Sequence, residues 1–178
     1  MNTHDQYGLI HRLLHWTVAA LVVGMLLGGL LLWVLPSGGF KNLVGFLHKS
    51  TGVLILLLML LRLAWRMANP RPRDLNPATP GLNVVAHLLH VCLYVLLLLQ
   101  PLAGILMSQA YGYPVVFFGL FELPPMIWHS PTLGSFFLEV HRATAIWITI
   151  AVVVHVAAAL KHHFVDRDRT LMRMIKGQ

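Results

Sequence analysis

Four long apolar segments alternate with shorter polar segments along the chain. Each is long enough to cross a bilayer as a helix, which takes about 20 residues. The apolar runs cover residues 13–35, 43–66, 83–109 and 135–164. A Pro-Ser-Gly-Gly sequence at 36–39 ends the first run, so the first two helices are expected to be antiparallel neighbours. The pattern predicts an all-α integral membrane protein, a bundle of four transmembrane helices.

The segments between the later runs are expected to be loops. Residues 69–80 contain four prolines. Residues 111–133 contain four more, together with aromatic side chains typical of a membrane interface, and are expected to be irregular. Residues 165–178 follow the last helix as a tail. We therefore interpret residues 1–178 as a single membrane domain.

The composition agrees with the pattern. The chain is 57% hydrophobic and 11% charged, and its mean hydropathy is +0.72. Such a chain needs a lipid bilayer around it. Its single cysteine, Cys92, excludes an internal disulfide and a covalent Cys-x-x-Cys-His haem site. The net charge of +7 does not indicate nucleic-acid binding, because the basic residues lie between the apolar runs and in the tail.

The distribution of Lys and Arg predicts the orientation. Basic residues are frequent in the N-terminal segment, the second connection and the tail, whereas the first connection has only Lys41 and the third has none. The residues on the richer side are Arg12, Arg66, Arg71, Arg73, Lys161, Arg167, Arg169, Arg173 and Lys176. The positive-inside rule then places both termini in the cytoplasm.

Histidines give the bundle its candidate chemistry. The last apolar run carries His141, Ile148, His155 and His162 at seven-residue steps, so all four share one helix face. His141 and His155 are fourteen residues apart, or about 21 Å along a helix. Two imidazoles near the two ends of one face indicate two stacked cofactor sites.

The predicted topology supplies a partner for each of these histidines. His15 lies near the cytoplasmic end of the first helix, level with His155, and His48 lies near the outer end of the second helix, level with His141. Two histidines from different helices at one depth are what a six-coordinate b-type haem requires. We therefore predict one haem between His15 and His155 and a second between His48 and His141.

The residue one turn after each of these four histidines is small, which leaves room for a porphyrin. After His87 and His90 in the third helix the same position is bulky, with Val91 and Tyr94. The small residues are Ala19, Gly52, Ala145 and Ala159. This comparison selects the same four histidines as the depth argument.

Two simpler interpretations compete with haem ligation. A histidine in a membrane helix can hydrogen-bond a neighbouring helix, although intramembrane ionisable groups are usually functional. A zinc site would need about four ligands converging on one point, and the two pairs lie about 20 Å apart along the helices.

Other polar residues are candidates for contacts around the haems. His87 and His90 could contact haem propionates or a quinone, or be ordinary interfacial residues. Arg62 lies fourteen residues after His48, so it could pair with an inner propionate or extend to the surface. The remaining candidates are Lys161 and His162 for a quinone site or interface anchoring, and Lys49 and Arg142 for outer propionates or steering of a small anion.

These residues occur in an order that resembles the bacterial cytochrome b561 family, which includes a superoxide oxidase. The resemblance covers essentially the whole chain. It rests on His15-Trp16, His48 with Gly52, Ala86-His87 with His90, His141, the run His-Val-Ala-Ala-Ala-Leu-Lys-His-His-Phe at 155–164, and Leu-Met-Arg-Met at 171–174.

The resemblance implies a four-helix cytoplasmic-membrane protein with two b haems, ligated by His15, His48, His141 and His155. It also implies electron transfer between ubiquinone and an outer partner, which in the most specific version is superoxide acting as donor to a superoxide:ubiquinone oxidoreductase. A membrane cytochrome that exchanges electrons with a periplasmic redox protein is the alternative within this class. A histidine-lined metal-ion or proton transporter is the alternative from another class, but it should have acidic residues in mid-membrane.

Overall fold

Four long helices and a short fifth one make up most of the structure, a computed structural model that describes residues 6–69 and 80–177. The helices are α1 (Leu9–Val34), α2 (Gly39–Ala68), α3 (Pro80–Ala110), α4 (Pro131–Phe164) and α5 (Thr170–Ile175). The first four are long and apolar enough to cross a membrane. They are the four predicted helices, extended at most ends by a few residues. The predicted loop at 70–79, with Arg71 and Arg73, lies outside the described residues.

The start of α4 shows why the sequence pattern placed it too late. Pro131 stands at the first helical position, where its fixed φ and missing N–H are tolerated. The Ser130 side chain accepts a hydrogen bond from the Leu133 amide and caps the helix. These local signals start the helix four residues before the apolar run expected at 135.

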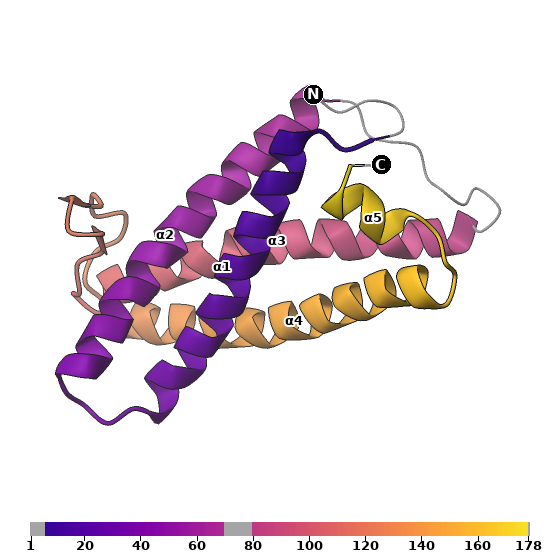
Figure 1. Cartoon of the computed structure of the whole chain (residues 1–178). Coiled ribbons are helices and arrows are strands. Elements are labelled where there is room, and N and C mark those ends of the chain that lie inside the picture. The colour runs from indigo at the N-terminus through magenta and orange to yellow at the C-terminus, as the bar shows by residue number, and fades with distance from the viewer. Residues whose placement is uncertain (1–5, 70–79, 178) are drawn as a thin grey trace.

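The helices are arranged as two antiparallel pairs, α1 with α2 and α3 with α4, which cross at an angle (Figure 1). We call the end at which α1 begins and α4 ends the tail end, and the opposite end, with the α1–α2 turn, the loop end. A buried cluster from all four long helices fills the crossing. It consists of Val18, Val22, Ile55, Met59, Leu97 and Ile148. Ile148 lies midway along α4 between His141 and His155, so this cluster separates the two candidate sites.

Residues 111–130 at the loop end are mostly irregular, as expected, but they also contain a short hairpin that the sequence did not predict. Strands β1 (Val116–Phe117) and β2 (Phe121–Glu122) pair as an antiparallel hairpin. Gly119 in its turn has φ +76°, which glycine adopts without a steric cost. Ser50 of α2 is buried and anchors the hairpin, since its hydroxyl donates to the Val116 carbonyl and accepts from the Phe118 amide.

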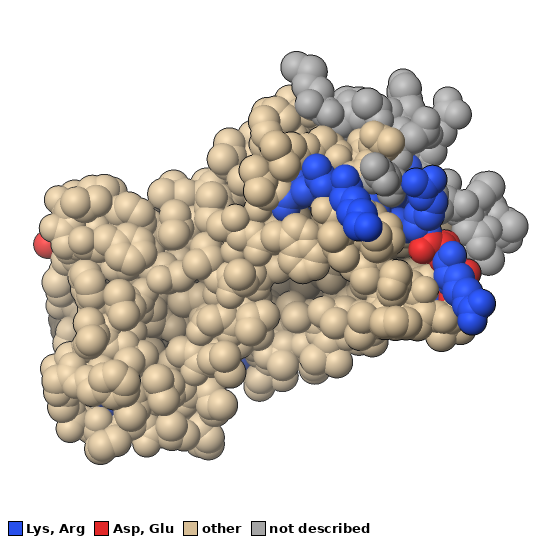
Figure 2. Space-filling model, in the orientation of Figure 1, with Lys and Arg blue, Asp and Glu red and all other residues tan. Residues whose placement is uncertain are grey.

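The tail also contains structure that the apolar pattern did not predict. Helix α5 folds back over the tail end, where Arg12 donates to the Ile175 carbonyl at 2.8 Å and Trp16 donates its indole N–H to Met174 at 3.1 Å. Arg173 of α5 is only 7% exposed. The first and last helices of the chain are thereby joined. Figure 2 shows Lys and Arg side chains gathered at this end of the visible face, with a long uncharged surface beyond them.

Candidate functional site

The structure brings the four predicted histidines together in the predicted pairs. At the loop end, the ring centres of His48 and His141 are 6.2 Å apart. At the tail end, those of His15 and His155 are also 6.2 Å apart. In each pair one histidine comes from α4 and the other from the α1–α2 pair, so the helix crossing positions both sites.

This separation fits two imidazoles on opposite sides of one metal ion. An imidazole nitrogen binds a metal at about 2 Å, and a further ~1 Å separates that nitrogen from the ring centre, giving about 6 Å between ring centres. Direct ring packing would allow a closer approach, as His90 shows. Its ring centre lies 5.2 Å from that of His155, too close for a shared metal ion between them. The residues present therefore fit two bis-histidine haem sites, with His90 beside the tail-end pair.

His141 is fixed against α3. Its Nδ1–H donates to the Gln100 carbonyl at 3.0 Å, which leaves the Nε2 lone pair for another partner. A Cβ at Gly104 would lie only 3.0 Å from the His141 ring, so the ring occupies space that a larger residue would fill. The loop-end site thus has a preset ligand tautomer and a glycine that admits the ring.

His48 lies against two consecutive glycines of α1. A Cβ at either Gly28 or Gly29 would be 3.6 Å from the His48 ring. The His48 Nδ1 is buried and has no hydrogen-bond partner among the described residues. A buried polar nitrogen without a partner is costly unless another group satisfies it, which supports a ligand-binding role for this ring.

Arg62 reaches the tail-end pair, as the fourteen-residue spacing from His48 had suggested. Its guanidinium donates to His15 Nδ1 at 2.9 Å and lies 5.4 Å from the centre of the Tyr94 ring. Arg66, one turn later, also stacks on Tyr94 but has no bond to His15. Arg62 therefore lies beside a predicted ligand. Two further candidates, His87 and His90, lie on α3. The His90 ring lies beside the tail-end pair, whereas His87 is not among the rings paired with His15 or His155.

Lys161 and His162 face acidic side chains in the turn after α4. Lys161 pairs with Asp166 at 2.6 Å, and His162 Nδ1 donates to Asp168 at 2.7 Å. Burial raises the pKa of Asp168, but hydrogen bonds from Thr170 and His162 outweigh it, so the pKa is lowered and Asp168 is ionised at neutral pH. The ligand atoms of His162, Asp166 and Asp168 lie within 4.8 Å of one another. The bond to Lys161 offsets the charge of Asp166, and His162 Nδ1 is already bonded to Asp168, so the group is a weak metal site.

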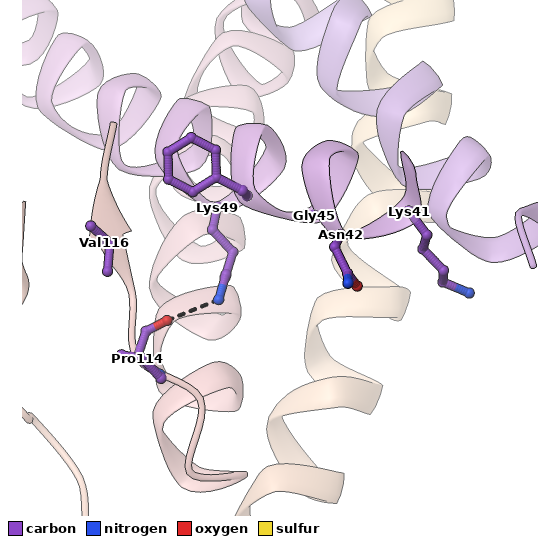
Figure 3. A pocket seen from close by; sticks show the side chains of 7 residues that line it. Lys41, Asn42, Gly45, Lys49, Pro114 and Val116 are labelled. Atoms are coloured by element: carbon purple, nitrogen blue, oxygen red, sulfur yellow. Dashed lines mark hydrogen bonds between the residues drawn. The ribbon is translucent and has the colours of Figure 1, made fainter. Parts of the chain in front are cut away.

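Lys49 and Arg142, the two cations predicted to act at the loop end, do not share a site. Lys49 lines a cavity of about 370 Å³ between the start of α2 and residues 114–116, and donates to the Pro114 carbonyl at 2.8 Å (Figure 3). Lys41 and Asn42 also line this cavity. Arg142 does not, since it is exposed and pairs with Glu139 at 2.8 Å. The cavity therefore has two cations, of which the sequence argument named one.

Sequence reasoning missed the residues that hold the ligand rings. These are Gln100 and Thr144 beside His141, and the ring-contacting glycines Gly28, Gly29 and Gly104. Each carries a weak signal, because glycines lower helix propensity and an amide is rare in an apolar run. Those signals become specific only when the helix crossing is known.

A family model described as Prokaryotic cytochrome b561 matches residues 6–177. Cytochrome b561 homolog 2 of Escherichia coli (strain K12) is 35% identical over 177 residues, covering 98% of this chain and 93% of the relative. Probable superoxide oxidase CybB of Yersinia pestis is 27% identical over 172 residues, covering 97% of each chain. Cytochrome b561 homolog 1 of Escherichia coli (strain K12) is 28% identical over 166 residues, covering 91% and 92%.

Proposed function

The chain belongs to the prokaryotic cytochrome b561 family of haem electron-transport membrane proteins, and from this we propose that it holds two b haems and passes electrons between its loop-end face and ubiquinone. The observation that carries the proposal is the pair of histidine couples, each with ring centres 6.2 Å apart. His48 and His141 are the ligands at the loop end, and His15 and His155 those at the tail end.

The protein's own residues determine what such sites can do. Bound b haem supplies one-electron chemistry between ferric and ferrous iron. A haem held by two histidines would have no iron position open to oxygen, which would favour electron transfer over oxygen binding. The buried cluster around Ile148 keeps water out of the region between the two pairs. The chain thus orients the ligands and supplies a dry, low-dielectric surround.

We place the tail end in the cytoplasm. The described basic residues at this end include Arg12, Arg66, Lys161, Arg167, Arg169 and Lys176. The visible face in Figure 2 shows the same asymmetry, and the positive-inside rule assigns such an end to the cytoplasmic side. The cavity with Lys41 and Lys49 then opens on the outer side, where its charge attracts small anions. Lys161 and His162 are the candidate quinone contacts at the cytoplasmic end.

Superoxide is the specific donor we propose, supported by the lysine-lined cavity and by the relative named a probable superoxide oxidase. Two superoxide anions each lose one electron and become dioxygen. Ubiquinone takes up both electrons and two protons and becomes ubiquinol.

The test adds superoxide to protein reconstituted in liposomes with ubiquinone and follows the haem absorption and ubiquinol formation. We expect rapid reduction that slows as ionic strength rises, because salt screens the attraction to Lys41 and Lys49. Changing both lysines to glutamine should slow the reaction, while Lys161→Gln at the opposite end should not slow the superoxide step. Reduction by ubiquinol but not by superoxide would reject this donor.

That result would favour a periplasmic redox protein as the partner. The observation in its favour is the apolar surface of the loop-end segment, where Leu120, Phe121 and Trp128 are 76%, 54% and 73% exposed. A metal-ion transporter has less support. Within the described parts of the four spans the single acidic residue is Glu139, which is exposed near the start of α4.

Arg62→Leu is expected to lower the midpoint potential of the tail-end haem. Ligation through His15 Nε2 puts the ring proton on Nδ1, which ends the present bond from Arg62 and frees the guanidinium for a propionate. A cation beside the site disfavours the more positive ferric state, so its loss stabilises ferric iron. A spectroscopic redox titration measures the shift. Arg66→Leu is the matched control and should shift the potential less; equal shifts would contradict a specific role for Arg62.

A further inference from the structure

A half-buried network of polar side chains surrounds His141, and the proposed electron transfer does not by itself require it. Gln100 of α3 contacts the ring twice, through its backbone carbonyl at Nδ1 and through its side-chain amide at Nε2, 3.2 Å away. The oxygen of that amide accepts a hydrogen bond from the Thr144 hydroxyl. Thr144 is only 6% exposed, and Gln100 and His141 are half-buried.

The hydrogen-bond directions in this network follow from one bond. Because His141 Nδ1–H donates to the Gln100 carbonyl, Nε2 of the neutral ring must accept. Gln100 therefore presents its NH₂ group to the ring and its oxygen to Thr144. The Thr144 hydroxyl then donates to Gln100, although the Val140 carbonyl also lies within 2.8 Å. Each polar atom in this chain of bonds has a partner of the correct kind.

The amide N–H end is thus held on the ligating side of the ring. Thr144 follows His141 by three residues on α4, so both side chains leave the same face of the helix. Metal binding through Nε2 would take the lone pair that the amide now contacts, and the Thr144 hydroxyl would still be placed to hold the other end of the amide. A positive N–H dipole in a buried, low-dielectric region acts strongly on any charge beside it.

We propose that Gln100, oriented by Thr144, is a positioning residue that raises the midpoint potential of the loop-end haem. The inference rests on the proposed dihaem function. It adds that Gln100 helps to set the driving force for electron transfer to the loop-end haem. The N–H end of the amide disfavours the additional positive charge of ferric iron. The backbone carbonyl separately fixes the His141 tautomer, and side-chain substitutions leave it in place.

The tail-end pair has no equivalent arrangement among the described residues. There the charged group in contact with a predicted ligand is Arg62, whose guanidinium donates to His15 Nδ1. Different groups therefore set the midpoint potentials of the two proposed haems, and a change at Gln100 should affect the loop-end haem only.

The experiment is a redox titration of purified Gln100→Leu, Gln100→Glu and Thr144→Val proteins, with haem content and ferric electron paramagnetic resonance spectra measured in parallel. His141→Ala and His155→Ala assign the two titration steps. We expect Gln100→Leu to shift the loop-end step about tenfold toward ferric iron, or 59 mV for a one-electron couple. Gln100→Glu should shift it further, because it adds a negative charge. Thr144→Val should give a smaller shift in the same direction.

Thr149→Val is the matched control, since Thr149 is an exposed α4 residue whose hydroxyl bonds to the Ala145 carbonyl of its own helix. It should leave both steps unchanged, as should every variant for the tail-end step. Full haem content with an unshifted loop-end step, or equal shifts at both haems, would overturn the role of Gln100 while leaving the proposed function intact. Wild-type protein that binds no haem would overturn both.

Discussion

Replacing His141 with alanine is expected to remove one of two haems and to abolish electron transfer from the outer donor. The ring provides one side of a 6.2 Å pair, and alanine leaves His48 without a partner across the site. The pyridine haemochrome assay should then give about half of the wild-type haem per protein. His48→Ala should have the same effect, and His15→Ala or His155→Ala should remove the other haem instead. Redox titration distinguishes the two losses, because a different step disappears in each case.

His90→Ala is the matched control for the tail-end pair. His90 is a histidine at the same depth and its ring centre lies 5.2 Å from that of His155. Its loss should change the spectrum of one haem at most, with both haems retained. If His90→Ala loses a haem while His15→Ala keeps both, the tail-end pairing is wrong. A dithionite-reduced wild-type spectrum without a b-type α-band would reject the dihaem function altogether.

Gly104→Ala is expected to empty most of the loop-end site without touching a ligand. The added methyl would lie 3.0 Å from Cε1 and 3.2 Å from Nδ1 of His141, tighter than nine in ten real Cβ contacts. The ring must move by a few tenths of an ångström, which displaces it from its position against the Gln100 carbonyl. Overpacking of this kind costs about 1–3 kcal/mol, which corresponds to roughly 5- to 150-fold weaker haem retention at this site. Haem content and the loop-end redox step are the measurements.

Gly24→Ala provides the comparison for this prediction. Gly24 is also a helical glycine in a span, but a Cβ there meets no atom within 4 Å. This substitution should retain both haems and should not lower thermal stability, because alanine favours the helix by up to about 1 kcal/mol. Wild-type haem content and potentials in Gly104→Ala would show that the His141 ring does not require this glycine.

The sequence predicted the helices and the histidine pairs from two simple quantities, apolar run length and depth. The helices and the pairing of the rings are both found in the structure, because the bilayer thickness sets the length of a spanning helix and the rise per residue sets the depth of each side chain. Depth alone was sufficient to match His15 with His155 and His48 with His141. The prediction that these residues bind haem iron remains to be tested by the variants above.

Other features could not be read from the sequence because they depend on how the helices cross. Gly28 and Gly104 approach ligand rings from neighbouring helices, and only the rotation of each helix decides which glycine does so. Gln100 has a role only because its helix faces Thr144. Helix α5 is six residues long, and its contact with Arg12 joins positions 163 residues apart. The hairpin strands have two residues each and depend on Ser50 of a distant helix.

Helix α4 supplies one histidine to each pair, and this has a consequence for the biogenesis of the protein. The helix is the last of the four spans to leave the ribosome, so neither site exists while α1, α2 and α3 are already in the membrane. At roughly 5–20 residues per second, this interval lasts several seconds after His48 is made. Under the proposed ligation, haem capture must therefore follow insertion of α4, and a chain truncated before residue 131 would carry His15 and His48 without a complete site for either proposed cofactor.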